Sequence, residues 1–218
     1  GVLAGCGTKT PTATKDAGKT ATKSVTLRLS DNQPAGYPTI IGDQAFAKEV
    51  EAKTNGRIKI KVFLGSQLGD EKSTIEQLQF GGIDAIRIGA APLAEFNKQI
   101  GALILPYLYK DKDQMFRVLE GPVGEKMFAS LSADSKIVGL SWVDSGARNF
   151  YNTKKDIKTP ADLKGLKIRV QESKPMMDMV KALGASSTPM AYGDVYSALQ
   201  TGVVDGAENN WPSYLSSN

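Results

Sequence analysis

The chain has 218 residues, a formal charge of +4 and 41% hydrophobic residues, so it can bury a substantial core as one large or two small domains. It contains no histidine and one cysteine, which excludes Ser-His-Asp catalysis, histidine-containing metal sites and an internal disulfide. The charge is mild and the lysines are dispersed, so we expect no nucleic-acid partner, and we expect no cofactor or metal.

Residues 1–24 are predicted to form a leader remnant and a flexible tether. Leu3-Ala4-Gly5-Cys6 resembles a bacterial lipobox, where a signal peptide is cleaved and the cysteine is lipidated. The stretch 7–23 is rich in Thr, Lys, Ala and Gly and cannot build a core. We therefore expect an extracytoplasmic protein anchored to the membrane through Cys6. The alternative is that Cys6 is merely a small apolar residue.

Strands and helices alternate in the next part of the chain. Apolar residues at every second position predict strands at 25–29 and 58–62, and a third strand is expected at 83–88. Helices are predicted at 42–54 and 70–80, the second one capped by Asp70. This order indicates a mostly parallel sheet covered by helices.

The segment 100–143 extends this first α/β set. Residues 100–108 are apolar and are interrupted by Pro106. Two helices are expected within 111–131, separated at Gly121-Pro122, because glycine ends helices and proline begins them. A further strand is predicted over 137–143.

A second α/β set begins near Ala147. Strands are predicted at 148–151, 166–170 and 203–205, a short helical turn at 159–162, and helices at 174–183 and 194–201. We therefore predict an α/β domain over 25–146 and a second, incomplete α/β domain over 147–218. Two such domains can bind a ligand in a cleft beyond the carboxyl ends of their strands and close around it by hinge motion.

Arg169 stands out within the strand predicted at 166–170. At a period of two, Leu166, Ile168 and Val170 share one face, and Arg169 lies on the other. An arginine in a strand beside a cleft requires an anionic partner, and its planar fork suits a carboxylate bound by two parallel hydrogen bonds. The alternative is a structural salt bridge.

Three motifs occur together in the second half of the chain: Gly-x-Arg-x-x-x-Asn at 146–152, Asp-Leu-Lys-Gly-Leu-Lys-Ile-Arg-Val at 162–170 and Asp-Gly-Ala-Glu-Asn at 205–209. In this combination the chain resembles the solute-binding proteins of tripartite ATP-independent periplasmic (TRAP) transporters, the DctP-like group, from Val25 to about Tyr214. The resemblance implies a periplasmic-binding-protein-like α/β fold, two domains around a ligand cleft, and delivery of a solute to a membrane permease. It also implies a C-terminal region beyond Asn218.

The resemblance assigns ligand-binding roles to several positions. It implies that Arg169 clamps a substrate carboxylate and that Arg148 supports it. The other implied contacts are Asn32, Glu71, Tyr192 and Asn209, with Asn210 and Tyr214 as weaker candidates. Plain structural roles remain open: an ion pair for Arg148, a first-turn helix acid for Glu71 and a core aromatic for Tyr192.

The amino-acid sequences of three segments, 71–77, 142–146 and 208–210, resemble those of the branch of this family that binds hexuronates or related sugar acids. Gly89-Ala90-Ala91 occupies a loop where other members carry an acid, which disfavours a sialic-acid-like ligand. A uronate offers one carboxylate for Arg169 and hydroxyls for Glu71, Asn32 and Asn209.

Two other functions remain open at this point. The first is a receptor for C4-dicarboxylates or other small acids, which Glu71 would disfavour through charge repulsion. The second is an enzyme acting on a sugar acid with Asp205 and Glu208 as an acid pair. We expect a binding protein without catalytic residues, because a turn after a strand does not make those two side chains converge.

Overall fold

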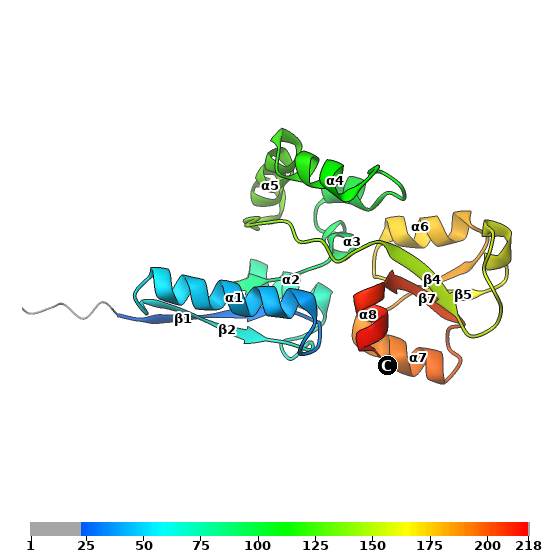
Figure 1. The fold of residues 1–218 in the computed structure, drawn as a ribbon, viewed down its shortest axis with the longest axis horizontal. Coiled ribbons are helices and arrows are strands. Elements are labelled where there is room, and N and C mark those ends of the chain that lie inside the picture. Colours follow the sequence, from blue (N-terminus) through cyan, green and yellow to red (C-terminus); the bar gives the residue numbers. More distant parts are fainter. Residues whose placement is uncertain (1–22, 218) are drawn as a thin grey trace, which may run out of the picture.

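The computed structural model describes residues 23–217, which form two β-sheets with helices packed around them (Figure 1). The lipobox and Cys6 lie outside these residues. None of the helices between residues 23 and 217 is long and apolar enough to cross a lipid bilayer. The fold is the mixed α/β architecture expected from the sequence.

The first sheet, sheet A, contains the strands β1 (Val25–Ser30), β2 (Ile58–Phe63) and β3 (Ala85–Ile86) in the order β2-β1-β3. All its neighbouring strands are parallel, and β1 pairs with β2 in register from Val25 opposite Ile58. Parallel neighbours require crossover connections. The helices α1 (Pro38–Lys53) and α2 (Glu71–Gln79) supply them, and α1 lies along β1 and β2 in Figure 1.

The helices beside sheet A begin where the local sequence dictates. Asp70 caps α2 by accepting a hydrogen bond from the Ser73 amide, as predicted. Helix α1 begins at Pro38, four residues before the predicted start, because a proline at the first helical position needs no amide donor. The remaining elements of this part are α3 (Ala90–Leu93), the 3-10 helix η1 (Lys98–Ile104), α4 (Lys112–Leu119) and α5 (Pro122–Ser135).

The break predicted at Gly121-Pro122 separates α4 from α5. A Cβ at Gly121 would lie 2.8 Å from the Arg117 carbonyl oxygen, so only glycine allows the chain to turn so closely. The strand predicted over 137–143 is wrong. This segment pairs with no described strand. Ile137 and Trp142 pack into a buried cluster, but Val138 and Leu140 are exposed and the segment has no ladder partner.

The second sheet, sheet B, contains β4 (Arg148–Asn152), β5 (Lys167–Val170), β6 (Ser186–Pro189) and β7 (Gly206–Asn210) in the order β4-β7-β5-β6. Only β4 is antiparallel to its neighbour. The 3-10 helices η2 (Pro160–Leu163) and η3 (Tyr192–Asp194) and the helices α6 (Lys174–Ala182), α7 (Val195–Gln200) and α8 (Trp211–Ser216) connect and cover these strands. A buried cluster that includes Ile168, Val170, Met176 and Val180 packs one face of the sheet.

The last strand differs from the prediction at 203–205. Strand β7 consists of Gly206, Ala207, Glu208, Asn209 and Asn210, all buried, between β4 and β5. A Cβ at Gly206 would lie 2.2 Å from the Tyr151 carbonyl oxygen, which explains the glycine. Hydrophobic periodicity missed this strand because its side chains are polar and are satisfied by tertiary partners. The domain boundary predicted between residues 146 and 147 stays a prediction.

Candidate ligand-binding site

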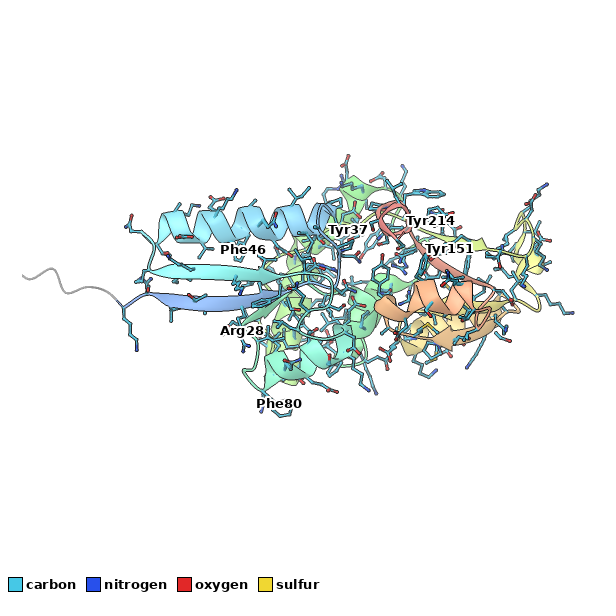
Figure 2. The ribbon with its side chains drawn as sticks, turned by 90° about the horizontal axis from the view of Figure 1, so that it is seen from below. Arg28, Tyr37, Phe46, Phe80, Tyr151 and Tyr214 are labelled. Atoms are coloured by element: carbon cyan, nitrogen blue, oxygen red, sulfur yellow. The ribbon has the colours of Figure 1, made fainter. Side chains whose placement is uncertain are left out.

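The two sheets present their carboxyl ends to one another. Tyr37, beside α1, donates a 3.2 Å hydrogen bond from its hydroxyl to Asn210 Oδ1 and lies 3.0 Å from Ser213 Oγ. Figure 2 shows Tyr37 at the end of α1 that faces the second part of the molecule. The Lys174 amide also donates to Glu95 Oε1 at 2.6 Å. Polar side chains of both parts therefore line one interface.

Arg169 is the largest fully buried side chain described, with an exposed fraction of 1%. Its Nε and Nη2 atoms both donate to the Met190 carbonyl oxygen, at 2.9 and 2.7 Å. It forms no ion pair with any residue between 23 and 217. A carbonyl oxygen carries no full charge, so this guanidinium retains an unneutralised positive charge in a largely dry setting.

The electrostatic surroundings of Arg169 favour an added anion. Burial lowers the pKa of the Arg169 guanidinium, Glu208 acts in the opposite direction, and Arg148 lowers the pKa further. A carboxylate bound against this guanidinium would remove the cost of burying the charge. Charge-assisted hydrogen bonds in such a setting are among the strongest available to a protein.

Arg148, in contrast, already has a carboxylate partner. Its Nε and Nη2 donate to the two carboxylate oxygens of Glu208, and Nη2 also donates to the Glu208 carbonyl oxygen at 2.9 Å. Burial acts to lower the pKa of Arg148, but Glu208 outweighs it and the pKa is raised. Arg148 begins β4 at the edge where β7 ends. Arg148 therefore lies next to the site, and its Nε and Nη2 donors are already used by Glu208.

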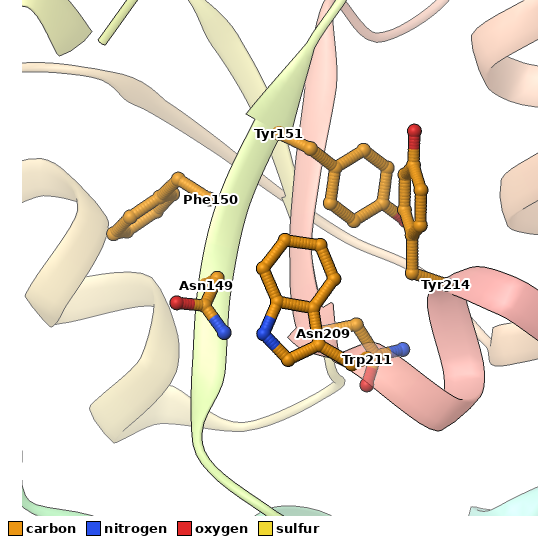
Figure 3. A pocket seen from close by; sticks show the side chains of 6 residues that line it. All are labelled: Asn149, Phe150, Tyr151, Asn209, Trp211 and Tyr214. Atoms are coloured by element: carbon orange, nitrogen blue, oxygen red, sulfur yellow. The ribbon is translucent and has the colours of Figure 1, made fainter.

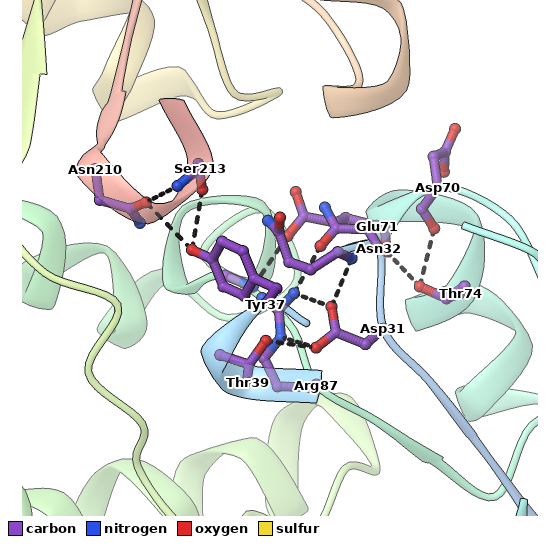
Figure 4. Close-up of polar contacts among 12 residues, drawn as sticks. Asp31, Asn32, Tyr37, Thr39, Asp70, Glu71, Thr74, Arg87, Asn210 and Ser213 are labelled. Carbon is purple, nitrogen blue, oxygen red and sulfur yellow. Dashed lines mark hydrogen bonds and ion pairs between the residues drawn. The ribbon is translucent and has the colours of Figure 1, made fainter. Parts of the chain in front are cut away.

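A third buried guanidinium, Arg87, was not identified from the sequence. It directly follows β3, and its Nε donates to Asp31 Oδ2 at 2.8 Å while Nη2 bonds Asp31 Oδ1. Thr39 Oγ1 and the Gln33 amide also donate to Asp31, at 2.7 and 2.8 Å. Figure 4 shows this network around Asp31, whose side chain is fully buried.

Asn32 and Glu71 lie beside this network, as the carboxyl-end rule predicts. Arg87 Nη2 donates to Asn32 Oδ1 at 2.6 Å. Glu71 Oε1 accepts a 3.1 Å hydrogen bond from the Gly89 amide. Burial acts to lower the pKa of Arg87, but Asp31 and, to a smaller extent, Glu71 outweigh it and the pKa is raised. Both predicted residues are thus held by neighbours, and each keeps polar atoms for a ligand.

The loop after β3 approaches the second part closely. A Cβ at Gly89 would lie 2.9 Å from Gln171 Nε2 and 3.2 Å from Glu71 Oε1. Gln171 directly follows β5, so this point brings together polar side chains from both sheets. The sequence analysis singled out the small Gly89-Ala90-Ala91 loop, but it did not predict that Gln171 lies beside this loop.

Other predicted residues gather around α8. The Tyr192 hydroxyl donates to the Ser213 carbonyl oxygen at 3.2 Å and lies 2.8 Å from Ser217 Oγ. Asn210 caps α8 by accepting from the Ser213 amide at 2.9 Å, and Asn209 Oδ1 accepts from the Asn210 amide at 2.9 Å. These bonds use the side-chain oxygens of both asparagines and leave their NH2 groups as donors.

A pocket of about 150 Å³ adjoins Asn209, lined by Asn149, Phe150, Tyr151, Asn209, Trp211 and Tyr214 (Figure 3). The Tyr151 and Tyr214 rings meet edge to face at 5.0 Å. The strand register places Arg169 and the pocket on the same face of sheet B. Arg169 pairs with Ala207, and Asn209, which lines the pocket, follows two residues later in β7. Tyr214 borders this pocket and contacts Tyr151.

A family model for DctP, described as bacterial extracellular solute-binding protein, family 7, matches residues 29–218. The chain belongs to this family. The structure of a TRAP periplasmic solute-binding protein from Xanthobacter autotrophicus Py2 with bound β-D-galacturonate is similar, with 47% identity and a TM-score of 0.85, and the match covers 88% of this chain and 63% of that one.

Two further matches agree with this assignment. A TRAP periplasmic solute-binding protein structure from Chromohalobacter salexigens with bound D-glucuronate is 41% identical, with a TM-score of 0.84 over 88% of this chain and 63% of that one. A solute-binding protein of the same species is 43% identical over 184 residues, which are 84% of this chain and 54% of the relative. The DctP-family chain thus spans about half the length of that curated relative. Its family consists of extracellular solute-binding proteins.

Proposed function

We propose that this DctP-family protein is the extracytoplasmic receptor of a TRAP transporter, which captures a hexuronate and delivers it to the membrane permease. The observation that carries the proposal is the buried guanidinium of Arg169, which forms no ion pair with any of residues 23–217. In our proposal Arg169 binds the single carboxylate of the sugar acid. Similar proteins with bound galacturonate and glucuronate support this ligand class.

The charge pattern supports a ligand with one carboxylate. Arg148 is paired with Glu208 and Arg87 with Asp31, so each of these cations is already neutralised. Among these three guanidiniums, only that of Arg169 has no acidic partner within the described residues 23–217. Among these three guanidiniums a second ligand carboxylate would find no further uncommitted cation, and it would be repelled by Glu71, which disfavours a C4-dicarboxylate.

The remaining polar groups suit sugar hydroxyls. Glu71 accepts hydrogen bonds, and the amides of Asn32 and Asn209 retain donors. Tyr192 and Asn210 border the same region, and we assign them a supporting role. The enzyme alternative has less support, because Asp205 bonds the Lys167 amide at 2.8 Å whereas Glu208 bonds Arg148. The two carboxylates are thus committed to separate partners.

Anchoring through Cys6 is a separate part of the proposal. Its support is the Leu3-Ala4-Gly5-Cys6 sequence followed by a polar stretch. Expressed with its natural signal, the protein should partition into detergent, and Cys6→Ser should release it to the aqueous phase. A wild-type protein that remains in the aqueous phase would contradict the anchor without affecting the receptor.

Calorimetric titration of the whole protein tests the receptor function. D-galacturonate and D-glucuronate should bind, succinate and malate should bind weakly or not at all, and no hexuronate should be consumed. At 100 times its dissociation constant, a ligand stabilises a protein by about 2.7 kcal/mol, so thermal shift gives a second readout. Tight succinate binding would favour the dicarboxylate receptor, and product formation would favour the enzyme.

A further inference from the structure

Arg87 links the two polar positions that the site draws from sheet A. Its guanidinium is tied to the buried Asp31 through Nε and Nη2, and the same Nη2 donates to Asn32 Oδ1 at 2.6 Å (Figure 4). Asp31 is itself fixed by Thr39 and by the Gln33 amide. The Arg87 side chain is 14% exposed, so the guanidinium is held in one place.

This contact decides which way the Asn32 amide points. A guanidinium has only donors, so the Asn32 atom that faces it must be the oxygen. The NH2 group of Asn32 is therefore the part left for a ligand, and within residues 23–217 it donates to no other group. Asn32 therefore presents its NH2 group, a donor, toward a ligand, while Oδ1 stays turned toward Arg87.

Glu71 offers the opposite polarity. As a carboxylate it only accepts hydrogen bonds, and Oε1 is held by the Gly89 amide at 3.1 Å. One fixed donor and one fixed acceptor beside the same guanidinium match two neighbouring hydroxyls, one accepting from Asn32 and the other donating to Glu71.

We propose that Arg87 is a positioning residue that fixes the hydrogen-bond polarity of Asn32, so that Asn32 and Glu71 together recognise a pair of neighbouring ligand hydroxyls. The inference rests on the proposed hexuronate function. Arg87 acts through Asn32 and does not touch the ligand. Its removal therefore loosens the discrimination of hydroxyl groups more than it weakens the binding of the carboxylate.

Two variants separate orientation from stability. Asn32→Asp keeps an oxygen facing Arg87 and so preserves the fold, but it deletes the donor. Arg87→Lys keeps a positive charge beside Asp31, but a single ammonium cannot replace a fork that bonds Asp31 and Asn32 together. In Arg87→Lys the Asn32 amide is free to rotate and present either end.

The probes are D-galacturonate and its monodeoxy analogues, titrated calorimetrically into the whole protein. One of these analogues lacks the hydroxyl that accepts from Asn32. Wild type should bind this analogue roughly tenfold more weakly than galacturonate, because the Asn32 donor is then left unpaired. Asn32→Asp should bind galacturonate roughly tenfold more weakly than wild type and should no longer distinguish that analogue. Arg87→Lys should reduce the discrimination to about twofold or threefold.

Each outcome decides a different question. If Arg87→Lys weakens galacturonate and the analogue equally, or if Asn32→Asp binds like wild type, the positioning role is overturned and the receptor proposal stands. If Arg87→Lys does not fold, Asn32→Asp still decides the polarity of the amide. If wild type binds neither galacturonate nor glucuronate, the proposed function fails and the inference fails with it.

Discussion

Arg148 holds the Glu208 carboxylate in a two-point ion pair, although the residues are 60 positions apart in the sequence. Strand β7 pairs with β4 and brings Glu208 beside Arg148. The Glu208 side chain is 2% exposed and that of Arg148 is 31% exposed. The pair therefore neutralises one cation at the edge of the site, whereas Arg169 has no acidic partner among residues 23–217.

The first prediction concerns this pair. Glu208→Gln should lower the free energy of unfolding by roughly 1–3 kcal/mol, because it leaves the part-buried guanidinium of Arg148 without an anion. The double variant Arg148→Met/Glu208→Gln should recover part of that loss. Urea unfolding in a double-mutant cycle measures both effects. Glu49→Gln, which breaks an exposed ion pair with Lys53, is the matched control and should change nothing measurable.

The second prediction concerns Arg169. Arg169→Lys should weaken hexuronate binding by roughly two to four decades, or about 3–5 kcal/mol, because a point charge cannot form two parallel hydrogen bonds. The ligand-free protein should stay folded. Calorimetric titration measures the effect, and Arg28→Lys in the exposed part of β1 is the control. Near-wild-type affinity would mean that the carboxylate binds elsewhere.

The third prediction concerns pH and Asp43 on α1. Burial, followed by the charge of Asp31, raises the pKa of Asp43 to about 7, and Asp43 Oδ2 meets no hydrogen-bond donor among residues 23–217. The folded pKa exceeds the unfolded value of 3.8. The contribution of this carboxyl to stability is therefore complete below about pH 3.8 and is lost as the pH rises through about 7.

Asp43→Asn should consequently stabilise the protein at pH 8 and have a smaller effect at pH 5. We expect a gain on the order of 1–2 kcal/mol at pH 8, since solvent screens part of the repulsion. Thermal unfolding at the two pH values measures the difference. Asp134→Asn, on the exposed part of α5, controls for the loss of one negative charge. Equal gains at both pH values would contradict the assignment.

The fourth prediction concerns Gly89. Gly89→Ala places a Cβ 2.9 Å from Gln171 Nε2 and 3.2 Å from Glu71 Oε1, so one or both side chains must move. Hexuronate affinity should fall roughly three- to tenfold with little change in melting temperature, because the clash is with side-chain atoms at the interface. Gly42→Ala, in α1 with open space around the new Cβ, should leave affinity unchanged. A loss of affinity in Gly42→Ala of similar size would contradict the local explanation.

Local sequence patterns predicted many of the helices and strands correctly but missed others. Asp70 caps α2, Gly121-Pro122 separates two helices, and Arg169 lies in a strand, all as predicted. The alternating segment 137–143 was wrong as a strand, because a strand also needs a partner. Strand β7 was missed, because the buried side chains of Glu208 and Asn210 are compensated by distant groups that no local pattern reveals.

The sequence alone determined the α/β order of the elements, the position of Arg169 in a strand and the placement of Asn32 and Glu71 after the strands of sheet A. Those features depend on neighbours within a few residues. Only the tertiary structure decided that Glu208 forms an ion pair with Arg148 and that Asp31 forms an ion pair with Arg87. Each of these ion pairs joins residues about 60 positions apart in the sequence. Strand order determines which charges meet, and hydrophobic periodicity carries no information about that order.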